Sequence, residues 1–386
     1  MYPNLQYLFQ DLFGLNIPFL AYLQSFGFLV AISFLLANYT MTLEMKRKER
    51  EGILKPVKVK VTLTELKKQR RSDLIGALIV GYVIGFKLVP LFTEGTGELS
   101  LQEFLFSGEG NFLAGILFAA GSAGYRFWRQ KSEALPTEDQ EGLVHPYEIM
   151  GNLTVAAAIT GLIGAKVFHN LENWDEFISD PIGNLVAFSG LTFYGGLIVG
   201  GGTVLYLAKK KNIHWRHMLD IGAPAMMLAY GVGRLGCQIS GDGDWGIVNT
   251  AAKPGWLSWA PDWLWSYTYP NNVLRDGVPI EGCVGEYCNQ LAEAVYPTPL
   301  YEAFVCVGLF FLLWKLRKRV KIPGMLFAIY LILNGFERFM IEKIRVNNKM
   351  DFLGMELTQA EIISFALILI GVIGIWYFRK NPLKKA

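Results

Sequence analysis

An all-α polytopic membrane protein with about nine transmembrane helices is the fold class that this sequence predicts, and three observations support it. Hydrophobic residues occupy 52% of the 386 positions and the mean hydropathy is +0.30. That is more apolar content than a soluble domain of this length needs. Apolar runs of about 20 residues, enough for a helix to cross the hydrocarbon layer, recur along the chain. Basic residues gather in alternate loops between these runs.

The apolar runs are expected to be helical, because backbone exposed to lipid must satisfy its own hydrogen bonds. The first run lacks a basic n-region and a clear cleavage site, so we expect it to be retained as a helix. Glycine and other small residues in several runs permit close helix packing. The expected spans are roughly 17–38, 73–93, 111–128, 148–169, 187–207, 218–236, 299–315, 323–342 and 359–378.

The loop charges predict the orientation of the chain, which we treat as a single membrane domain over residues 1–386. The basic segments are 45–71, 126–131, 209–217, 315–321 and the tail from 379. The alternate loops 93–110, 170–181 and most of 238–298 are poor in lysine and arginine. By the positive-inside rule the basic side is cytoplasmic, which places the N-terminus outside and the C-terminus inside. The formal net charge of +3 is too small to indicate a nucleic-acid partner.

The loop 238–298 is long and rich in Trp, Gly and Pro, and it predicts a small extracytoplasmic cap with short elements. Cys283 and Cys288 lie in this loop, where the compartment permits a disulfide; pairing and free thiols both stay open. We expect no metal site, because the chain has neither a CxxC pair nor an HExxH motif.

Polar side chains from five predicted spans share one depth, the outer half of the bilayer. An ionisable residue inside a span costs about 2.5–3.5 kcal/mol and therefore suggests a function. Asn334, Arg338, Glu342 and Arg345 follow one helical stripe. The other polar residues at this depth are Lys166, Tyr194, Arg234, Tyr301 and Glu302.

Each of these residues also has an alternative explanation. Arg234 and Lys166 can snorkel to the headgroups, and Glu342 can neutralise a neighbouring arginine. Asp242 and Asp244 can serve turn chemistry, and the tyrosines can belong to an interfacial belt. The shared depth favours a common polar cavity that opens outward.

Arginines beside glycine-rich backbone suit a phosphate, because guanidinium groups match phosphate oxygens bidentately. At headgroup depth, that phosphate indicates a phospholipid. The segment "GRLGCQISGDGDWG" (233–246) combines these features, and its glycines are expected to turn the chain tightly after Arg234. The chain has no P-loop, dinucleotide fingerprint or Gly-x-Ser-x-Gly elbow.

Four motifs, in order along the chain, carry a family resemblance. The segment 233–246, second in this order, keeps Gly233, Arg234, Gly236 and Gly246 of a pattern that reads roughly Gly-Arg-x-Gly-Asn-Phe-x-Asn-x-Glu-x-x-Gly. Asp242 or Asp244 stands in place of the glutamate. The other motifs are "TFYGGLI" (192–198), "YPTPLYE" (296–302) and the set Arg338, Phe339, Glu342 and Arg345. Together they resemble the prolipoprotein diacylglyceryl transferase family, which has seven spans. The resemblance implies that 39–128 is an inserted basic loop and helix pair.

The departures from the family pattern concern proton transfer. Tyr194 and Tyr296 replace histidines, Cys237 and Asn334 replace an asparagine and a tyrosine, and Lys166 replaces an arginine. A tyrosine with a pKa near 10 is a poor base at neutral pH, although it can donate a hydrogen bond to phosphate. The candidate bases are then Asp242, Asp244 and Glu302.

The resemblance implies an enzyme of the bacterial cytoplasmic (inner) membrane that acts at the outer leaflet. It would transfer the sn-1,2-diacylglyceryl group of phosphatidylglycerol to the lipobox cysteine of a preprolipoprotein signal peptide, without a cofactor. The expected catalytic residues are Arg234, Arg338, Tyr194, Asp242, Asp244 and Glu302. The expected substrate-binding residues are Gly195, Gly196, Gly233, Gly236, Tyr301, Asn334, Glu342, Arg345 and Lys166. The alternatives are a non-catalytic membrane protein that binds phospholipid or anions, and a transporter, which the lack of an inverted repeat disfavours.

Overall fold

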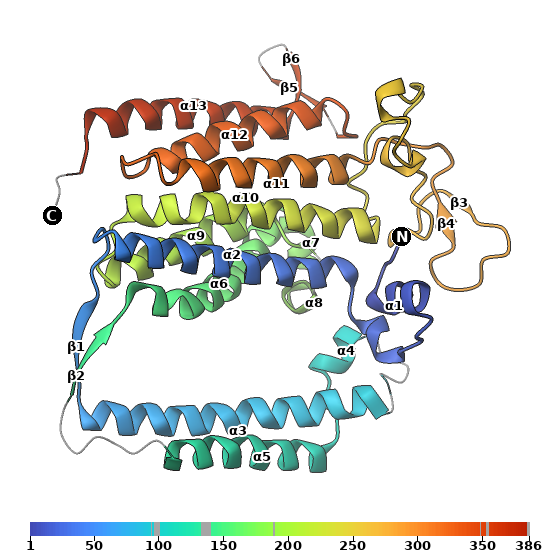
Figure 1. Cartoon of the computed structure of the whole chain (residues 1–386). Helices are drawn as coiled ribbons and strands as arrows, with labels where there is room; N and C mark the ends of the chain where they lie inside the picture. The colour runs from blue at the N-terminus through green and yellow to red at the C-terminus, as the bar shows by residue number, and fades with distance from the viewer. Residues whose placement is uncertain are drawn as a thin grey trace. The chain divides into compact units, whose positions relative to one another are not determined.

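The computed structural model describes residues 1–93, 95, 101–132, 140–187, 190–347, 349–352 and 355–383 (Figure 1). This part of the chain is mostly helical, as predicted. It divides into two compact units. Unit 1 comprises residues 1–51, 150–156 and 203–386, and unit 2 comprises 52–149 and 157–202.

Each predicted span overlaps a long helix, but the first was placed too early: the span expected at 17–38 begins in a 3-10 turn (Pro18–Tyr22), and its helix runs from Ser25 to Arg50, into the segment predicted as a basic loop. Residues 188–189 of the span expected at 187–207 lie outside the described residues. The long helices that overlap the predicted spans are α2 (Ser25–Arg50), α3 (Leu63–Thr93), α5 (Phe112–Ser132), α6 (Met150–Glu172), α9 (Phe193–Lys210), α10 (Trp215–Ser240), α11 (Thr298–Leu316), α12 (Met325–Glu342) and α13 (Gln359–Lys380). By length and composition, five described helices could cross a membrane: α2, α3, α11, α13, and α6 with the turn before it. The count of nine spans and the orientation of the chain stay predictions.

The remaining elements are short. The helical ones are α1 (Leu5–Phe13), η1 (Pro18–Tyr22), α4 (Leu101–Phe106), η2 (Pro146–Ile149), α7 (Trp174–Ser179), α8 (Pro181–Val186), η3 (Gly255–Leu257) and η4 (Asp262–Leu264). Three antiparallel pairs complete the list: β1 (Val57–Val61) with β2 (Gln140–Val144), β3 (Val278–Pro279) with β4 (Asn289–Gln290), and β5 (Lys349–Phe352) with β6 (Met355–Thr358).

The centre of unit 1 is α10, which packs against α2, α11 and α12, and α13 in turn packs against α12 (Figure 1). The buried core between α10, α11 and α12 consists of Ala223, Met227, Cys306, Phe310, Leu313, Leu326 and Tyr330. Asp220 of α10 caps the start of α12, because its carboxylate accepts the N–H groups of Gly324 at 2.8 Å and Phe327 at 3.1 Å. This contact holds the start of α12 against α10.

Unit 2 contains two close helix pairs. In the first, α3 packs along α5, and a Cβ at Gly115 would lie 2.9 Å from the Tyr82 ring. In the second, α6 packs along α9, where a Cβ at Gly164 would lie 2.5 Å from the Gly195 carbonyl oxygen. Small residues therefore set the helix separation in both pairs, as their composition predicts. The β1–β2 ribbon runs from Val57 opposite Val144 to Val61 opposite Gln140.

Between the end of α10 at Ser240 and the start of α11 at Thr298, the chain contains only short elements, namely η3, η4 and the β3–β4 pair. Cys283 and Cys288 form a disulfide within this segment. Tyr269 of this segment is fully buried, and its hydroxyl donates to Gln238 of α10 at 2.7 Å. The cap is thereby tied to the end of α10.

Candidate functional site

The end of α10 turns the chain back on itself. Gly241 adopts a left-handed φ of 65° and its N–H donates to the Cys237 carbonyl at 3.0 Å, which ends the helix. Gly243 follows with a φ of 94°. These two conformations bring Asp244 back toward Arg234, which lies two turns earlier on the helix. The glycines are therefore used for the tight turn that the sequence predicts.

Gly246 brings the same loop against the chain that follows α12. It forms an antiparallel bridge with Arg345, and Ile247 donates its N–H to the Ile344 carbonyl at 2.9 Å. A Cβ at Gly246 would lie 2.6 Å from the Ile344 oxygen, so a larger residue does not fit this approach. As a result, Asp244 and Arg345 face each other across two segments far apart in sequence.

Six ionisable side chains form what we call the charged cluster: Arg234, Asp244, Glu302, Arg338, Glu342 and Arg345. At its centre is Glu302 of α11, whose side chain is fully buried. Its carboxylate lies 2.5 Å from Arg234 Nε, 2.9 Å from Arg338 Nη1 and 3.4 Å from Arg345 Nη1. One buried carboxylate thus holds three guanidinium groups from different parts of the chain.

Two further carboxylates complete the charged cluster. Asp244 pairs with both Arg234 and Arg345, and its backbone carbonyl accepts the Thr298 hydroxyl at 2.8 Å. Glu342 lies 3.0 Å from Arg338 Nη2, one turn away on α12. The formal charges of the three arginines and three carboxylates balance, which allows so many ions to share a largely buried site.

The two aspartates of the turn have opposite electrostatic environments. Burial acts to raise the pKa of Asp244, but the adjacent Arg234 and Arg345 guanidiniums outweigh it and hold that pKa below its ordinary value. Burial, and then the charge of Asp244, raise the pKa of Asp242. Asp242 Oδ1 is buried and has no hydrogen-bond partner among the described residues. Asp242 is therefore the better proton acceptor of the pair.

Ligand atoms of Cys237, Asp242 and Asp244 lie within 4.8 Å of one another, close enough to hold a metal ion. However, two arginines already contact Asp244, and their positive charges oppose a cation at this position. We assign no metal to this group.

The structure brings some predicted site residues to the charged cluster and gives others a different contact. The Tyr301 hydroxyl donates to the Leu264 carbonyl at 2.9 Å and so braces the cap. A Cβ at Gly236 would lie 3.2 Å from Phe26 of α2, whereas the space at Gly233 is open. Asn334 lies one turn before Arg338 on α12.

Four predicted site residues belong to unit 2. Lys166 is buried in α6, and Tyr194 at the start of α9 keeps 37% of its surface exposed. Gly195 and Gly196 lie in the α6–α9 contact, where a Cβ at Gly195 would lie 2.5 Å from Phe168 Cβ. The two glycines therefore have a packing role within their own unit.

Two neighbours of the charged cluster were not predicted. The Tyr230 ring lies under the Arg234 guanidinium, 5.3 Å from it, in a cation–π contact. Its position four residues before Arg234 was a usable helical signal. Glu337 is buried in α12, and neither of its carboxylate oxygens has a hydrogen-bond partner in the described part of the chain. In the sequence, the feature that could have identified Glu337 is a carboxylate inside an apolar run.

Comparison with known proteins gives the same family that the four motifs indicate. The family model of prolipoprotein diacylglyceryl transferase matches residues 111–377. The chain belongs to this family. A phosphatidylglycerol–prolipoprotein diacylglyceryl transferase of Staphylococcus xylosus is 31% identical over 67% of this chain and 82% of its own length. Enzymes of that name from Streptococcus sanguinis and Chlorobaculum tepidum are 30% and 31% identical, over 61% and 59% of this chain and 81% and 72% of their own lengths.

Membership of the prolipoprotein diacylglyceryl transferase family makes the chain a transferase of lipoprotein biosynthesis, and its apolar helices are those of a membrane protein. The match spans the whole charged cluster and also α6 and α9 of unit 2.

Proposed function

We propose that the chain transfers the sn-1,2-diacylglyceryl group of phosphatidylglycerol to the lipobox cysteine of a preprolipoprotein. The observation that carries the proposal is the convergence of Arg234, Arg338 and Arg345 on one buried carboxylate, in a chain of this family. Each guanidinium contacts carboxylates through two of its nitrogens. Because a guanidinium has five N–H donors, donors remain for a lipid phosphate.

The chemistry divides into a proton transfer and a displacement. The substrate thiol loses its proton, since the thiolate is the nucleophile. The sulfur then forms a bond to the terminal glycerol carbon of the diacylglyceryl group, and the bond from that carbon to the phosphate oxygen breaks. Its electron pair leaves with glycerol-1-phosphate. The product is a thioether, and the arginines stabilise the departing phosphate. This step uses no cofactor.

Among the three candidate bases, Asp242 fits the proton transfer best. Glu302 and Asp244 each form ion pairs with at least two guanidiniums, and those of Arg234 and Arg345 hold the pKa of Asp244 below its ordinary value. None of the ion pairs formed by the described residues involves Asp242, and its buried Oδ1 is free to accept a proton. We therefore assign the base to Asp242 and the positioning of the arginines to Glu302 and Asp244.

Tyr194 and Lys166 are proposed to contact substrate. Tyr194 would donate a hydrogen bond to phosphate in place of the family histidine, and Lys166 would supply a positive charge in place of the family arginine. The loop charges support an active site that faces the outer leaflet of the bacterial inner membrane. Exported preprolipoproteins would present their lipobox cysteine there.

The test is a transfer assay with purified protein, phosphatidylglycerol and a lipobox peptide. We expect product from the wild type and a loss of about 100-fold or more in Arg234→Ala, the size of effect typical for removal of one transition-state donor. Arg275→Ala is the matched control, because Arg275 forms an exposed ion pair with Glu286 in the cap. Tyr194→Phe then tests whether the hydroxyl contributes.

Absence of product from folded wild-type protein, with several lipids and peptides, would contradict the proposal. It would favour the alternative of a family member that binds phospholipid without transfer. Equal losses in Arg234→Ala and Arg275→Ala would remove the assigned role of Arg234.

A further inference from the structure

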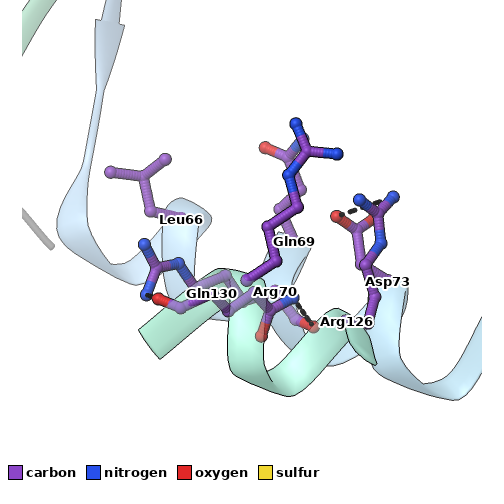
Figure 2. Close-up of a pocket in the computed structure, with 7 residues that line it drawn as sticks. Leu66, Gln69, Arg70, Asp73, Arg126 and Gln130 are labelled. Carbon is purple, nitrogen blue, oxygen red and sulfur yellow. Dashed lines mark hydrogen bonds and ion pairs between the residues drawn. The ribbon is translucent and has the colours of Figure 1, made fainter. Parts of the chain in front are cut away.

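Polar side chains of α3 in unit 2 have partners on the neighbouring segments. In a pocket of about 210 Å³ between α3 and α5, Arg70 and Gln130 each donate a side-chain hydrogen bond to the other's backbone carbonyl, at 2.8 and 3.0 Å (Figure 2). In the same pocket Arg126 Nη2 lies 3.8 Å from Asp73 Oδ2. Lys87 is buried, and its ammonium group donates to three backbone carbonyls at 2.6 to 2.8 Å. These contacts join α3 to its neighbours, and we assign them a structural role.

Glu337 of α12, in unit 1, differs from these residues. Its side chain is buried, and in the described part of the chain it is the one buried residue in which neither carboxylate oxygen has a hydrogen-bond partner. Glu361 of α13 is equally buried, yet its carboxylate accepts the Thr358 N–H at 2.9 Å and pairs with Lys343. An unpartnered buried polar group lowers the stability of a fold, so its presence needs an explanation.

Glu337 lies beside the charged cluster. It occupies the face of α12 that packs against α10 and α11, because Tyr330, two turns earlier, belongs to the core between these helices. The carboxyl group is close enough to interact electrostatically with Glu302 of α11 and Arg234 of α10, and Arg338 is the next residue. Glu337 is therefore within electrostatic range of the guanidinium groups that are proposed to hold the lipid phosphate.

The charge balance of the cluster favours a neutral Glu337. Three carboxylates already match the three arginines. An ionised Glu337 would add a buried negative charge without a bonded partner, which is strongly unfavourable in a site of low polarity. The neutral acid carries one O–H donor. Its proton has no acceptor among the described residues, so it is available to a ligand.

We propose that Glu337 is the general acid of the transfer reaction, an inference that rests on the proposed function. When the bond from the glycerol carbon to the phosphate oxygen breaks, the electron pair stays on that oxygen and the proton of Glu337 moves to it. Glycerol-1-phosphate then departs with one negative charge instead of two, which eases its release from the buried site.

The proton balance involves two carboxyl groups. Asp242 gains the proton of the thiol, and Glu337 loses its proton to the phosphate. Exchange with water after product release restores both groups. One ionised and one neutral carboxyl group in contrasting environments is an arrangement that supplies both a base and an acid at the same pH.

The first test is the pH–rate profile of transfer by the full-length wild type, Glu337→Gln and Glu337→Asp. Glutamine keeps the size and a hydrogen-bond donor but cannot release a proton, so kcat should fall about 100-fold or more with little change in KM. The wild-type rate should fall as the pH is raised, because Glu337 must be protonated to act. The residual rate of Glu337→Gln should lack this alkaline fall, and Glu337→Asp should keep part of the rate.

Other titratable groups surround Glu337, so the variant is needed to assign the alkaline fall. They are Tyr230 and Arg234 of α10, Glu302 and Cys306 of α11, Tyr330 and Arg338 of α12, and Arg345. On α13, which also packs against α12, Glu361 contacts Lys343 instead. Loss of the alkaline fall in Glu337→Gln, with these groups still present, would assign it to Glu337.

The second test separates a catalytic role from a structural one through the unfolding temperature. Glu337→Met replaces an unpartnered polar group with an apolar side chain of similar size, so it should raise the unfolding temperature by a few degrees while transfer is lost. Glu361→Gln is the matched control, because that carboxylate is equally buried but bonded. It should lower the unfolding temperature and leave the pH profile unchanged.

Four outcomes would overturn the inference. Wild-type activity in Glu337→Gln at every pH would remove the role of general acid. A lower rate with the alkaline fall intact would make Glu337 a positioning residue. A lower unfolding temperature in Glu337→Met would show that the carboxyl group supports the packing. These three outcomes leave the proposed function standing, whereas absence of product from the wild type would contradict the proposed function and this inference together.

Discussion

At Glu302, one carboxylate without solvent exposure contacts three guanidinium groups. Removal of one partner from a buried ion network costs about 3–5 kcal/mol, because the remaining charges stay desolvated and unpaired. We therefore expect Glu302→Gln to lower the unfolding temperature of the detergent-solubilised protein by several degrees. Glu286→Gln is the control, because that carboxylate forms an exposed ion pair worth about 1 kcal/mol or less. Similar unfolding temperatures for the two variants would contradict the central role of Glu302.

The raised pKa of Asp242 predicts how the rate of transfer depends on pH. The carboxylate must be ionised to accept the thiol proton, and burial raises its pKa above the ordinary aspartate value of about 3.9. Activity should therefore fall as the pH is lowered through this raised pKa, at a higher pH than an exposed aspartate would give. Asp242→Asn should lose the activity and Asp242→Glu should retain part of it with a shifted acid limb. An unchanged pH–rate profile in Asp242→Asn would assign the base to another residue.

At the scale of elements, substitutions in the α6–α9 contact can distinguish a packing role of Gly195 from a substrate-binding role. Gly195→Ala would place a Cβ against Phe168 Cβ and the Gly164 carbonyl, and overpacking of this kind costs about 1–3 kcal/mol. Gly202→Ala in the same helix meets open space and should be neutral or stabilising by up to about 1 kcal/mol. The measurement is the unfolding temperature of each variant, together with KM for phosphatidylglycerol. A raised KM in Gly195→Ala at unchanged stability would favour the predicted substrate contact instead.

Hydropathy predicted the positions of the long helices but not their ends or the small sheets. The expected span 218–236 is the centre of α10, which runs from Trp215 to Ser240 because Gly241 ends it with a left-handed conformation. The sequence "VKVKV" at 57–61 alternates with the period of a strand, yet it lies in a basic segment that we treated only as a loop. A two-stranded ribbon depends on its partner, here 140–144, and that pairing is not visible in either segment alone.

The candidate site was predictable in part for a physical reason. The stripe of Asn334, Arg338 and Glu342 follows from helical spacing alone, and the structure contains the Arg338–Glu342 contact. The pairing of Asp244 with Arg345 was not predictable, because it depends on the turn at Gly243 and on the bridge between Gly246 and Arg345. Local spacing cannot show such a long-range closure.

For the whole molecule, the inserted segment 39–128 stays a prediction. The family model begins at residue 111, so α5 lies within the match and α2 and α3 precede it. In the structure α2 packs on α10 in unit 1, whereas α3 packs on α5 in unit 2. This arrangement supports α2 as part of the helix group that carries the charged cluster, and α3 and α5 as a separate pair.

The orientation of the whole chain can be tested with single cysteines in intact cells. The native background is favourable, because Cys237 and Cys306 are buried and Cys283 and Cys288 are joined in a disulfide. A membrane-impermeant maleimide should therefore label Ser258→Cys, an exposed position in the cap, without lysis. Lys209→Cys, exposed at the basic end of α9, should be labelled only after lysis, because the positive-inside rule places it in the cytoplasm. Labelling of Lys209→Cys in intact cells, with Ser258→Cys protected, would show the opposite topology. The charged cluster, at the cap end of α10, would then lie on the cytoplasmic side. An exported lipobox cysteine could not reach it there.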